Sequence, residues 1–250
     1  MSRRSAPGLA AAAILVGLGF NAPYAVLTAT FDYPGILRAP AGEVLSRFAD
    51  GGPALIATWY AFMLFALALA PLAAGLALHG DRLVRTPAAA GLAAMLGGLA
   101  ALAQAIGLSR WVFVVPALAD LHGSGDAALR LMAEQQFAML NLFAGVGVGE
   151  HIGQLLTAGF VAALGLTEAA QGRRRLAMAG YLTAGLIALG TGEGLAIALG
   201  ADGDLFSLAT IAGYLGLTAW LVALGISLAR PGQARPTPGV KRAASKPSVA

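Results

Sequence analysis

A long apolar segment carries three polar side chains between small glycines: Glu150, His151 and Gln154, within Gly145–Thr157 (GVGVGEHIGQLLT). A carboxylate, an imidazole and an amide in this setting can bind an ion, exchange a proton or hydrogen-bond a small polar molecule. Ionisable side chains are costly inside apolar segments of membrane length, so they usually mark functional sites. The core of the pattern recurs as Gly190-x-Gly192-Glu193, which makes Glu193 a second carboxylate candidate.

The two glutamates are equally distant from a basic turn at Arg173–Arg175, since positions 150 and 193 are centred on 171/172. Two helices joined by this turn form an antiparallel hairpin, which places Glu150 and Glu193 at nearly the same depth. Taking the inner membrane boundary near Leu166 and Leu176, each glutamate is 16 or 17 residues up its helix, or about 25 Å, close to the outer edge of a hydrocarbon core of about 30 Å. We therefore expect the two carboxylates to approach each other, or a shared partner, where water can reach them.

Arg110 ends another apolar segment at a similar level and is the predicted counter-charge of the glutamates. Gln154 follows Glu150 at a spacing of i+4, so the two side chains share a helix face. Asn21 and Tyr24 add polar groups from the first apolar segment. The predicted ligand-binding residues are therefore Glu150, His151, Gln154, Glu193, Arg110, Asn21 and Tyr24.

Three arrangements of the glutamate pair stay open, because two unpaired carboxylates repel in a low dielectric. They are a salt bridge to Arg110, a proton shared by the pair, and a bound cation. A packing interpretation also stays open, in which the glutamates and His151 only hold helices together while the glycines allow close contact. His151 lies about 100° from Glu150 around a helix, so the two side chains face different neighbours.

Other kinds of chemistry have little support in the sequence. The chain has no cysteine, which excludes disulfides, thiolate metal sites and thiol nucleophiles. No metalloprotease, nucleotide-binding or serine-hydrolase motif occurs in a credible context, and the glycine strings match membrane-helix spacing. We predict no catalytic residue and no metal site, and the sequence specifies no cofactor.

The composition is that of a membrane protein. Of the 250 residues, 58% are hydrophobic and 11% are charged, whereas soluble domains carry about 25% charged residues. We predict an all-α membrane protein, a six-transmembrane-helix bundle that forms one domain over residues 1–229. The predicted helices are 8–30, 53–78, 88–115, 137–166, 176–199 and 205–228, with the first bent near Pro23.

The distribution of charge predicts the topology. Twelve of the sixteen Lys and Arg residues fall on the side that holds both termini, and the acidic residues show the reverse bias. Positive residues favour the cytoplasmic side, so we predict that both termini are cytoplasmic and that the membrane is the bacterial inner (plasma) membrane. The pI of about 9.9 follows from this topology, and we predict no nucleic-acid partner.

The predicted partners are of three kinds. The lipid bilayer surrounds the six helices, and the basic tail of residues 230–250, predicted to be disordered, attracts anionic lipid headgroups. A homo-oligomer is the third prediction, because six helices are few for a transporter that acts alone.

Two predicted outer connections are longer than a hairpin needs. Phe31–Gly52 resembles a short amphipathic helix with Val44, Leu45 and Phe48 on one face. Pro116–Glu134 offers a loop and then a helix that begins near Asp126. Two interpretations stay open for these connections: packing at the membrane interface, or a lid over an outer pocket.

Four patches together carry a family resemblance: Phe31–Arg38 (FDYPGILR), Gly51–Tyr60 (GGPALIATWY), Arg110–Pro116 (RWVFVVP) and Gly149–Thr157 (GEHIGQLLT). With them the chain resembles a bacterial membrane family known only as domain of unknown function 4386, over roughly Leu9 to Leu228. The resemblance implies a multi-pass membrane protein and carries no established activity.

The leading functional hypothesis is a membrane protein that binds, transports or senses a small molecule or ion in an outward-facing polar pocket. One alternative is an intramembrane enzyme that uses Glu150 or His151 as an acid or base. Another is a structural or assembly subunit whose polar groups only lock the helices together.

Overall fold

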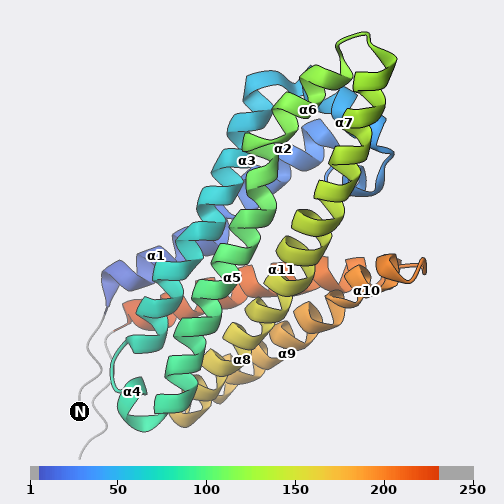
Figure 1. Cartoon of the computed structure of the whole chain (residues 1–250). Helices are drawn as coiled ribbons and strands as arrows, with labels where there is room; N and C mark the ends of the chain where they lie inside the picture. Colours follow the sequence, from blue (N-terminus) through green and yellow to red (C-terminus); the bar gives the residue numbers. More distant parts are fainter. Residues whose placement is uncertain (1–5, 231–250) are drawn as a thin grey trace, which may run out of the picture.

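The computed structural model describes residues 6–230, and this part of the chain is helical without any β-strand (Figure 1). Within these residues, six helical stretches are long and apolar enough to cross a membrane. The predicted fold class is therefore confirmed, and the protein is a multi-pass membrane protein. The six spans are Pro7–Phe31, Ala41–Leu78, Pro87–His122, Ala127–Ala170, Arg174–Ala198 and Asp204–Ala229.

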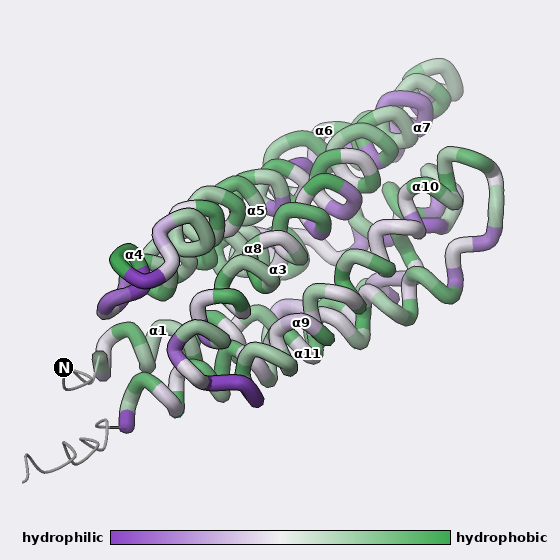
Figure 2. The backbone as a smooth tube through the Cα atoms, turned by 90° about the horizontal axis from the view of Figure 1, so that it is seen from below, coloured by the Kyte–Doolittle hydropathy of each residue, from purple (hydrophilic) through white to green (hydrophobic). Residues whose placement is uncertain are grey.

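Breaks and turns divide the spans into shorter elements. In chain order these are α1 (Pro7–Gly19), α2 (Asn21–Phe31), the 3₁₀ helix η1 (Gly35–Arg38), α3 (Ala41–Leu78), α4 (Arg82–Arg85), α5 (Pro87–Phe113), α6 (Val115–His122), α7 (Ala127–Leu140), the π-helix η2 (Asn141–Ile152), α8 (Gly153–Ala170), α9 (Arg174–Gly190), α10 (Gly192–Ala198) and α11 (Asp204–Ala229). Most of the hydrophilic residues lie near helix ends (Figure 2).

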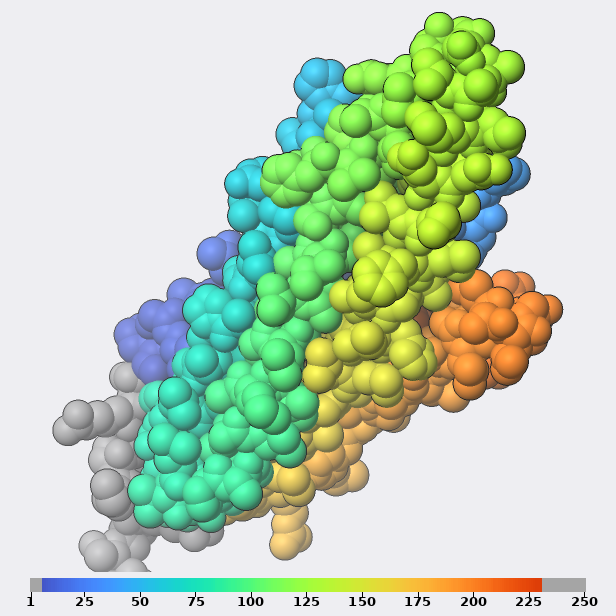
Figure 3. Space-filling view, in the orientation of Figure 1, coloured from blue at the N-terminus to red at the C-terminus, as the bar shows by residue number. Residues whose placement is uncertain are grey.

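The spans form a ring in chain order, in which each span packs on the next and α11 returns to α1. On one face, α3, α5 and the helix that runs from α7 through η2 into α8 lie side by side (Figure 3). Two apolar clusters fill the ring. One, from α1, α3, α5, α8, α9 and α11, includes Phe160, Ile187 and Trp220, and the other, which includes Phe31, Trp59 and Trp111, joins α2, η1, α3, α5, α6 and α7.

The first span is interrupted at Phe20, between α1 and α2. Pro23 explains the position of the break, because it has no backbone N–H to bond the carbonyl of the residue four positions earlier, Gly19. The Asn21 amide bridges the break: its Nδ2 donates to the carbonyl of Gly17 at 2.9 Å and to Thr218 Oγ1 on α11 at 3.0 Å. The predicted bend is therefore present, three residues before the proline.

The second span begins earlier than the apolar run alone predicts. The amphipathic helix expected between Phe31 and Gly52 is the first part of α3, which begins at Ala41, and Val44 and Phe48 are buried on it. The joint is Gly52, whose φ of 55° and ψ of −153° redirect the chain. A side chain at this φ is strained, so glycine is what permits the kink.

The fourth span also extends beyond its predicted limits. Asp126 caps α7, since its Oδ1 accepts hydrogen bonds from the backbone N–H of Ala128 at 2.7 Å and Leu129 at 3.1 Å. This confirms the predicted helix start near Asp126. The helix then continues without a turn into η2 and α8, so it forms one long element.

The helix predicted over residues 137–166 is present, but residues 141–152 form the π-helix η2 and not a regular α-helix. Close contact with α5 accompanies the wider turn. A Cβ added at Gly107 would lie 2.7 Å from the Cα of Gly149, so only glycine permits this approach between the two helices. π-helical segments are rare and often occur at functional sites.

A buried ionic group, here called the turn cluster, lies where α8 meets α9 and consists of Arg82, Glu168 and Arg173. Arg82 pairs with Glu168, and Arg173 Nε lies 2.6 Å from the other oxygen of Glu168. The predicted tail, apart from Arg230, lies outside the described residues.

Candidate binding cavity

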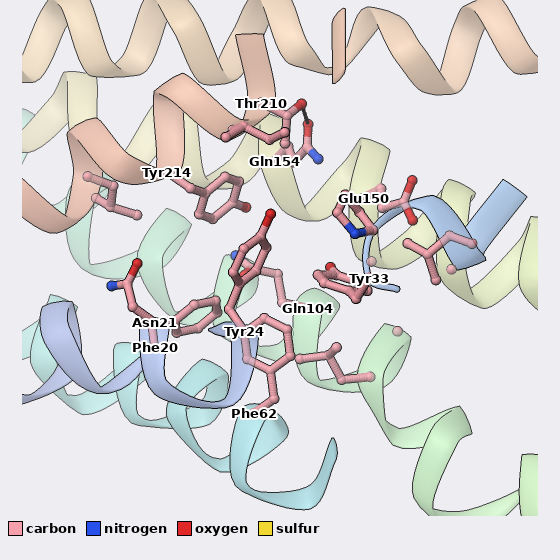
Figure 4. Close-up of a pocket in the computed structure, with 18 of the residues that line it drawn as sticks. Phe20, Asn21, Tyr24, Tyr33, Phe62, Gln104, Glu150, Gln154, Thr210 and Tyr214 are labelled. Carbon is pink, nitrogen blue, oxygen red and sulfur yellow. Dashed lines mark hydrogen bonds between the residues drawn. The ribbon is translucent and has the colours of Figure 1, made fainter. Parts of the chain in front are cut away.

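A cavity of about 530 Å³ lies between the two apolar clusters. All six spans and the segment before α3 contribute to its walls, which are mostly apolar and aromatic (Figure 4). Six of the seven predicted site residues line it: Asn21, Tyr24, Arg110, Glu150, Gln154 and Glu193. The structure therefore gathers in one cavity polar groups that lie far apart in the sequence.

Three charged side chains at the cavity, here called the cavity cluster, are Arg38, Glu150 and Glu193. Nη2 of Arg38 lies 2.7 Å from Oε2 of Glu150 and 2.9 Å from Oε1 of Glu193. A single guanidinium nitrogen thus bridges both carboxylates. The exposed fractions of the three side chains are 34%, 24% and 17%, so the cluster is partly open to its surroundings.

The prediction that the two glutamates share a partner is confirmed, but the partner is Arg38 and not Arg110. Arg110 is buried on α5, where it donates to the carbonyl of Gly107 and to Oδ1 of Asn141. Its guanidinium carbon also lies 5.0 Å from the ring centre of Trp111. These contacts hold Arg110 against the helix wall, so among the described residues it forms no ion pair with either glutamate.

Arg38 reaches the glutamates because its segment folds back against the bundle. Ile36 and Leu37 are buried in the aromatic cluster, and the carbonyl of Leu37 accepts a hydrogen bond from Asn141 Nδ2 at 3.2 Å. Burial acts to lower the pKa of Arg38, but Glu150 and Glu193 together outweigh it, so the pKa lies above its ordinary value. The guanidinium is therefore charged at any physiological pH.

Aromatic side chains form the wall next to the cavity cluster. The Tyr33 ring packs edge-on against Tyr24 at 5.3 Å and Trp59 at 5.4 Å between ring centres, and Trp59 stacks on Trp111 at 4.7 Å. Burial, with a smaller effect of Glu150, raises the pKa of the Tyr33 phenol, so this phenol stays neutral. Figure 4 shows Tyr24, Tyr33 and Tyr214 around a shared space.

A chain of amide and hydroxyl groups forms a second polar strip. Gln104 Nε2 donates to Thr157 Oγ1 at 2.8 Å, and Thr157 in turn donates to the carbonyl of Gly153 at 2.7 Å. One turn nearer the cavity cluster, Gln154 Oε1 accepts from Thr210 Oγ1 at 3.4 Å, drawn as a dashed line in Figure 4. These groups can orient a polar ligand without adding charge.

His151 does not line the cavity. Its Nδ1 lies 2.9 Å from the carbonyl of Thr191, which joins η2 to the junction of α9 and α10. A carbonyl only accepts, so Nδ1 is the donor in this hydrogen bond. The expectation that His151 and Glu150 face different neighbours is confirmed.

Within residues 6–230, no group of three or more His, Cys, Asp or Glu side chains could hold a metal ion. The residue that sequence reasoning missed is Arg38, which was assigned only to a connection. A signal for it exists, since Arg38 ends the Phe31–Arg38 patch that carries the family resemblance.

Comparison with known protein families agrees with this resemblance. A sequence profile described as Domain of unknown function (DUF4386) matches residues 8–225. The chain belongs to this family. The matched range covers nearly all of the membrane-spanning helices of this family member and both the cavity and turn clusters. No curated protein and no solved structure matches the chain.

Proposed function

We propose that this membrane protein binds a small molecule in the cavity, as a transporter or a sensor does. The observation that carries the proposal is the cavity of about 530 Å³ to which all six spans contribute, with the cavity cluster in its wall. Binding sites for small molecules are clefts of roughly 300–1,000 Å³ with mostly apolar walls and a few convergent polar groups.

The two alternatives have less support. An enzyme that uses His151 as its acid or base has little support, because His151 bonds the Thr191 carbonyl and does not line the cavity. An enzyme that uses Glu150 needs this carboxylate free, but Glu150 pairs with Arg38. A subunit that only locks helices needs close packing, as in the turn cluster, and has no use for a cavity that all six spans line.

The setting of this activity stays a proposal too. We propose the bacterial inner membrane, cytoplasmic termini, an outward-facing cavity, a homo-oligomer and contact of the tail with anionic lipids. The charge bias of the sequence supports the topology and the lipid contact.

The test uses three compounds that share an aromatic body and differ in head-group charge: phenylbutylammonium, phenylbutyrate and phenylbutanol. Each radiolabelled compound is dialysed to equilibrium against the protein in nanodiscs of zwitterionic lipid, and binding to empty nanodiscs is subtracted. Ile211→Trp fills the cavity from α11, and Leu208→Trp adds the same bulk three residues earlier at an exposed position outside the lining.

We expect saturable binding of at least one compound to the wild type and to Leu208→Trp, and loss of that binding in Ile211→Trp. If none of the three compounds binds saturably, or if Ile211→Trp binds as the wild type does, the proposed function is wrong.

A further inference from the structure

The acidic side chains that line the cavity lie on the membrane spans, whereas one of the two basic side chains lies on a segment outside them. Three carboxylates, Glu150, Glu193 and Asp204, are carried by the spans, whereas the lining cations are Arg38 and Arg110. Arg38 belongs to η1, outside the spans, and its side chain is the most exposed of the cavity cluster. When the Arg38 side chain turns away, three negative charges face one positive charge.

In the described part of the chain the remaining cation, Arg110, forms no ion pair with either glutamate, and its charge acts on Glu150 only at a distance. Arg110 donates hydrogen bonds to the Gly107 carbonyl and to Oδ1 of Asn141, and its guanidinium lies over the Trp111 ring. In the described part of the chain, only Arg38 makes an ion pair with Glu150 or Glu193.

The glutamates already show which ligand atom they accept. One nitrogen, Nη2 of Arg38, donates hydrogen bonds to both carboxylates, at 2.7 Å to Glu150 and 2.9 Å to Glu193. A ligand ammonium is a single nitrogen with three donors, so it can occupy this position and bond both oxygens. The geometry therefore suits a positively charged nitrogen on any chain that brings it there.

The walls beside this position suit an apolar, aromatic body. Tyr24, Tyr33, Trp59, Phe62 and Trp111 all line the cavity. Aromatic rings bury large apolar surfaces, and their faces attract cations. The carboxylates can therefore bind the charged group of an organic cation, and the aromatic rings can pack against its apolar body.

The Arg38 side chain can leave without unfolding its segment. The backbone of η1 is held by buried Ile36 and Leu37 and by the bond from Asn141, none of which involves the guanidinium. Besides the two glutamates, the only acceptor for the Arg38 guanidinium in the described residues is the carbonyl of Leu37 at 3.5 Å, a long contact. A change of rotamer is therefore enough to uncover both carboxylates.

Resting on the proposed function, we infer that the cavity ligand is an organic cation whose ammonium or guanidinium head binds between Glu150 and Glu193. Its apolar body lies against the aromatic wall. Arg38 occupies the head-group position of the free protein and is displaced when the ligand binds. Arg38 thus acts as an internal competitor of the ligand. The apparent affinity of the protein for the ligand equals its intrinsic affinity multiplied by the fraction of time that Arg38 leaves the site free.

The experiment measures the three phenylbutyl compounds on variants of the cavity cluster in the same nanodiscs. We expect phenylbutylammonium to bind more tightly than phenylbutanol and phenylbutyrate. Glu193→Gln should weaken phenylbutylammonium by about tenfold or more, through the loss of one charge-assisted hydrogen bond. Glu150→Gln should act in the same way, and either variant suffices if the other folds poorly.

Arg38→Ala should strengthen phenylbutylammonium binding, by about tenfold if Arg38 occupies the site nine-tenths of the time. Arg38→Lys keeps a cation on η1 and should stay near the wild type. The matched control is Arg47→Ala, because Arg47 pairs with Glu43 at 2.9 Å and does not line the cavity.

Two results would overturn the inference while the proposed function stands. In the first, phenylbutyrate or phenylbutanol binds more tightly than phenylbutylammonium, and Ile211→Trp abolishes this binding. In the second, Arg38→Ala binds phenylbutylammonium more weakly than the wild type does. The first would assign the head group to Arg110 or to the polar strip of Gln104, Gln154 and Thr210, and the second would make Arg38 part of the binding surface. Failure of all three compounds rejects both proposals.

Discussion

The cavity cluster and the turn cluster each join three charged side chains, but they differ in charge, burial and surroundings. The cavity cluster has one arginine for two glutamates and side chains 17–34% exposed. The turn cluster has one glutamate for two arginines, and the Arg82 and Glu168 side chains are fully buried. Only the cavity cluster lines the cavity.

The turn cluster is also held by neighbours on several elements. Arg82 donates to the carbonyl of Leu76, and Arg173 Nη1 donates to Ser227 Oγ on α11 at 3.0 Å. These bonds tie α3, the α4 turn, the α8–α9 connection and α11 together. An ionic group enclosed in this way stabilises the fold, whereas the partly exposed Arg38 pairs can exchange one cation for another. The comparison therefore separates a structural from an exchangeable ionic group.

The largest expected effect is that of Glu168→Gln. Removing one partner of a buried ion pair costs about 3–5 kcal/mol, because the other charges stay buried without it. The free energy of unfolding, measured by denaturant titration in mixed micelles, should fall by this amount. The matched variant Glu193→Gln removes a carboxylate from the cavity cluster and should cost far less; equal losses would show that the two clusters do not differ as described.

The next effect concerns the contact that brings η2 against α5. Gly107→Ala adds a Cβ only 2.7 Å from the Cα of Gly149 and 3.0 Å from the carbonyl of Ala144, so the two backbones must separate. Overpacking of this kind costs about 1–3 kcal/mol. Gly98→Ala on the same helix is the control, since nothing lies within 4 Å of its new Cβ. A Gly107→Ala protein as stable as Gly98→Ala would contradict the close contact.

A smaller change is expected for Arg38→Ala. Partly exposed ion pairs contribute about 0–1 kcal/mol, so the free energy of unfolding should fall by less than about 1 kcal/mol. Arg82→Ala, compared under the same conditions, should approach the loss predicted for Glu168→Gln. If Arg38→Ala instead unfolds the protein, the cavity cluster is structural and Arg38 cannot serve as an exchangeable cation.

The last prediction concerns topology and not stability: it tests which side of the membrane the α6–α7 connection and the α8–α9 connection face. Because the chain has no cysteine, Ser124→Cys and Ala170→Cys each supply a single exposed thiol, the first between α6 and α7 and the second at the end of α8. An impermeant maleimide added to intact cells should label Ser124→Cys but not Ala170→Cys. The reverse pattern would place the cavity on the cytoplasmic side.

Much of the framework could be predicted from local patterns in the sequence. Apolar runs set the number of spans, Pro23 predicted a bend, and Asp126 marked the start of a helix because its cap bonds only nearby backbone N–H groups. The common level of Glu150 and Glu193 followed from counting residues to the Arg173–Arg175 turn. Each of these properties depends on rise per residue or on neighbours along the chain.

The partner of the glutamates and the π-helix were decided by the tertiary structure. Arg110 stands at the expected level, yet the packing of α5 turns it toward Asn141 and Trp111, and Arg38 takes its place because buried Ile36 and Leu37 fold η1 back over the bundle. Helical rise determines the depth of a residue in the membrane, but not the direction that its side chain faces or the path of a connection. Those depend on which surfaces pack together, and that is a property of the whole ring of helices.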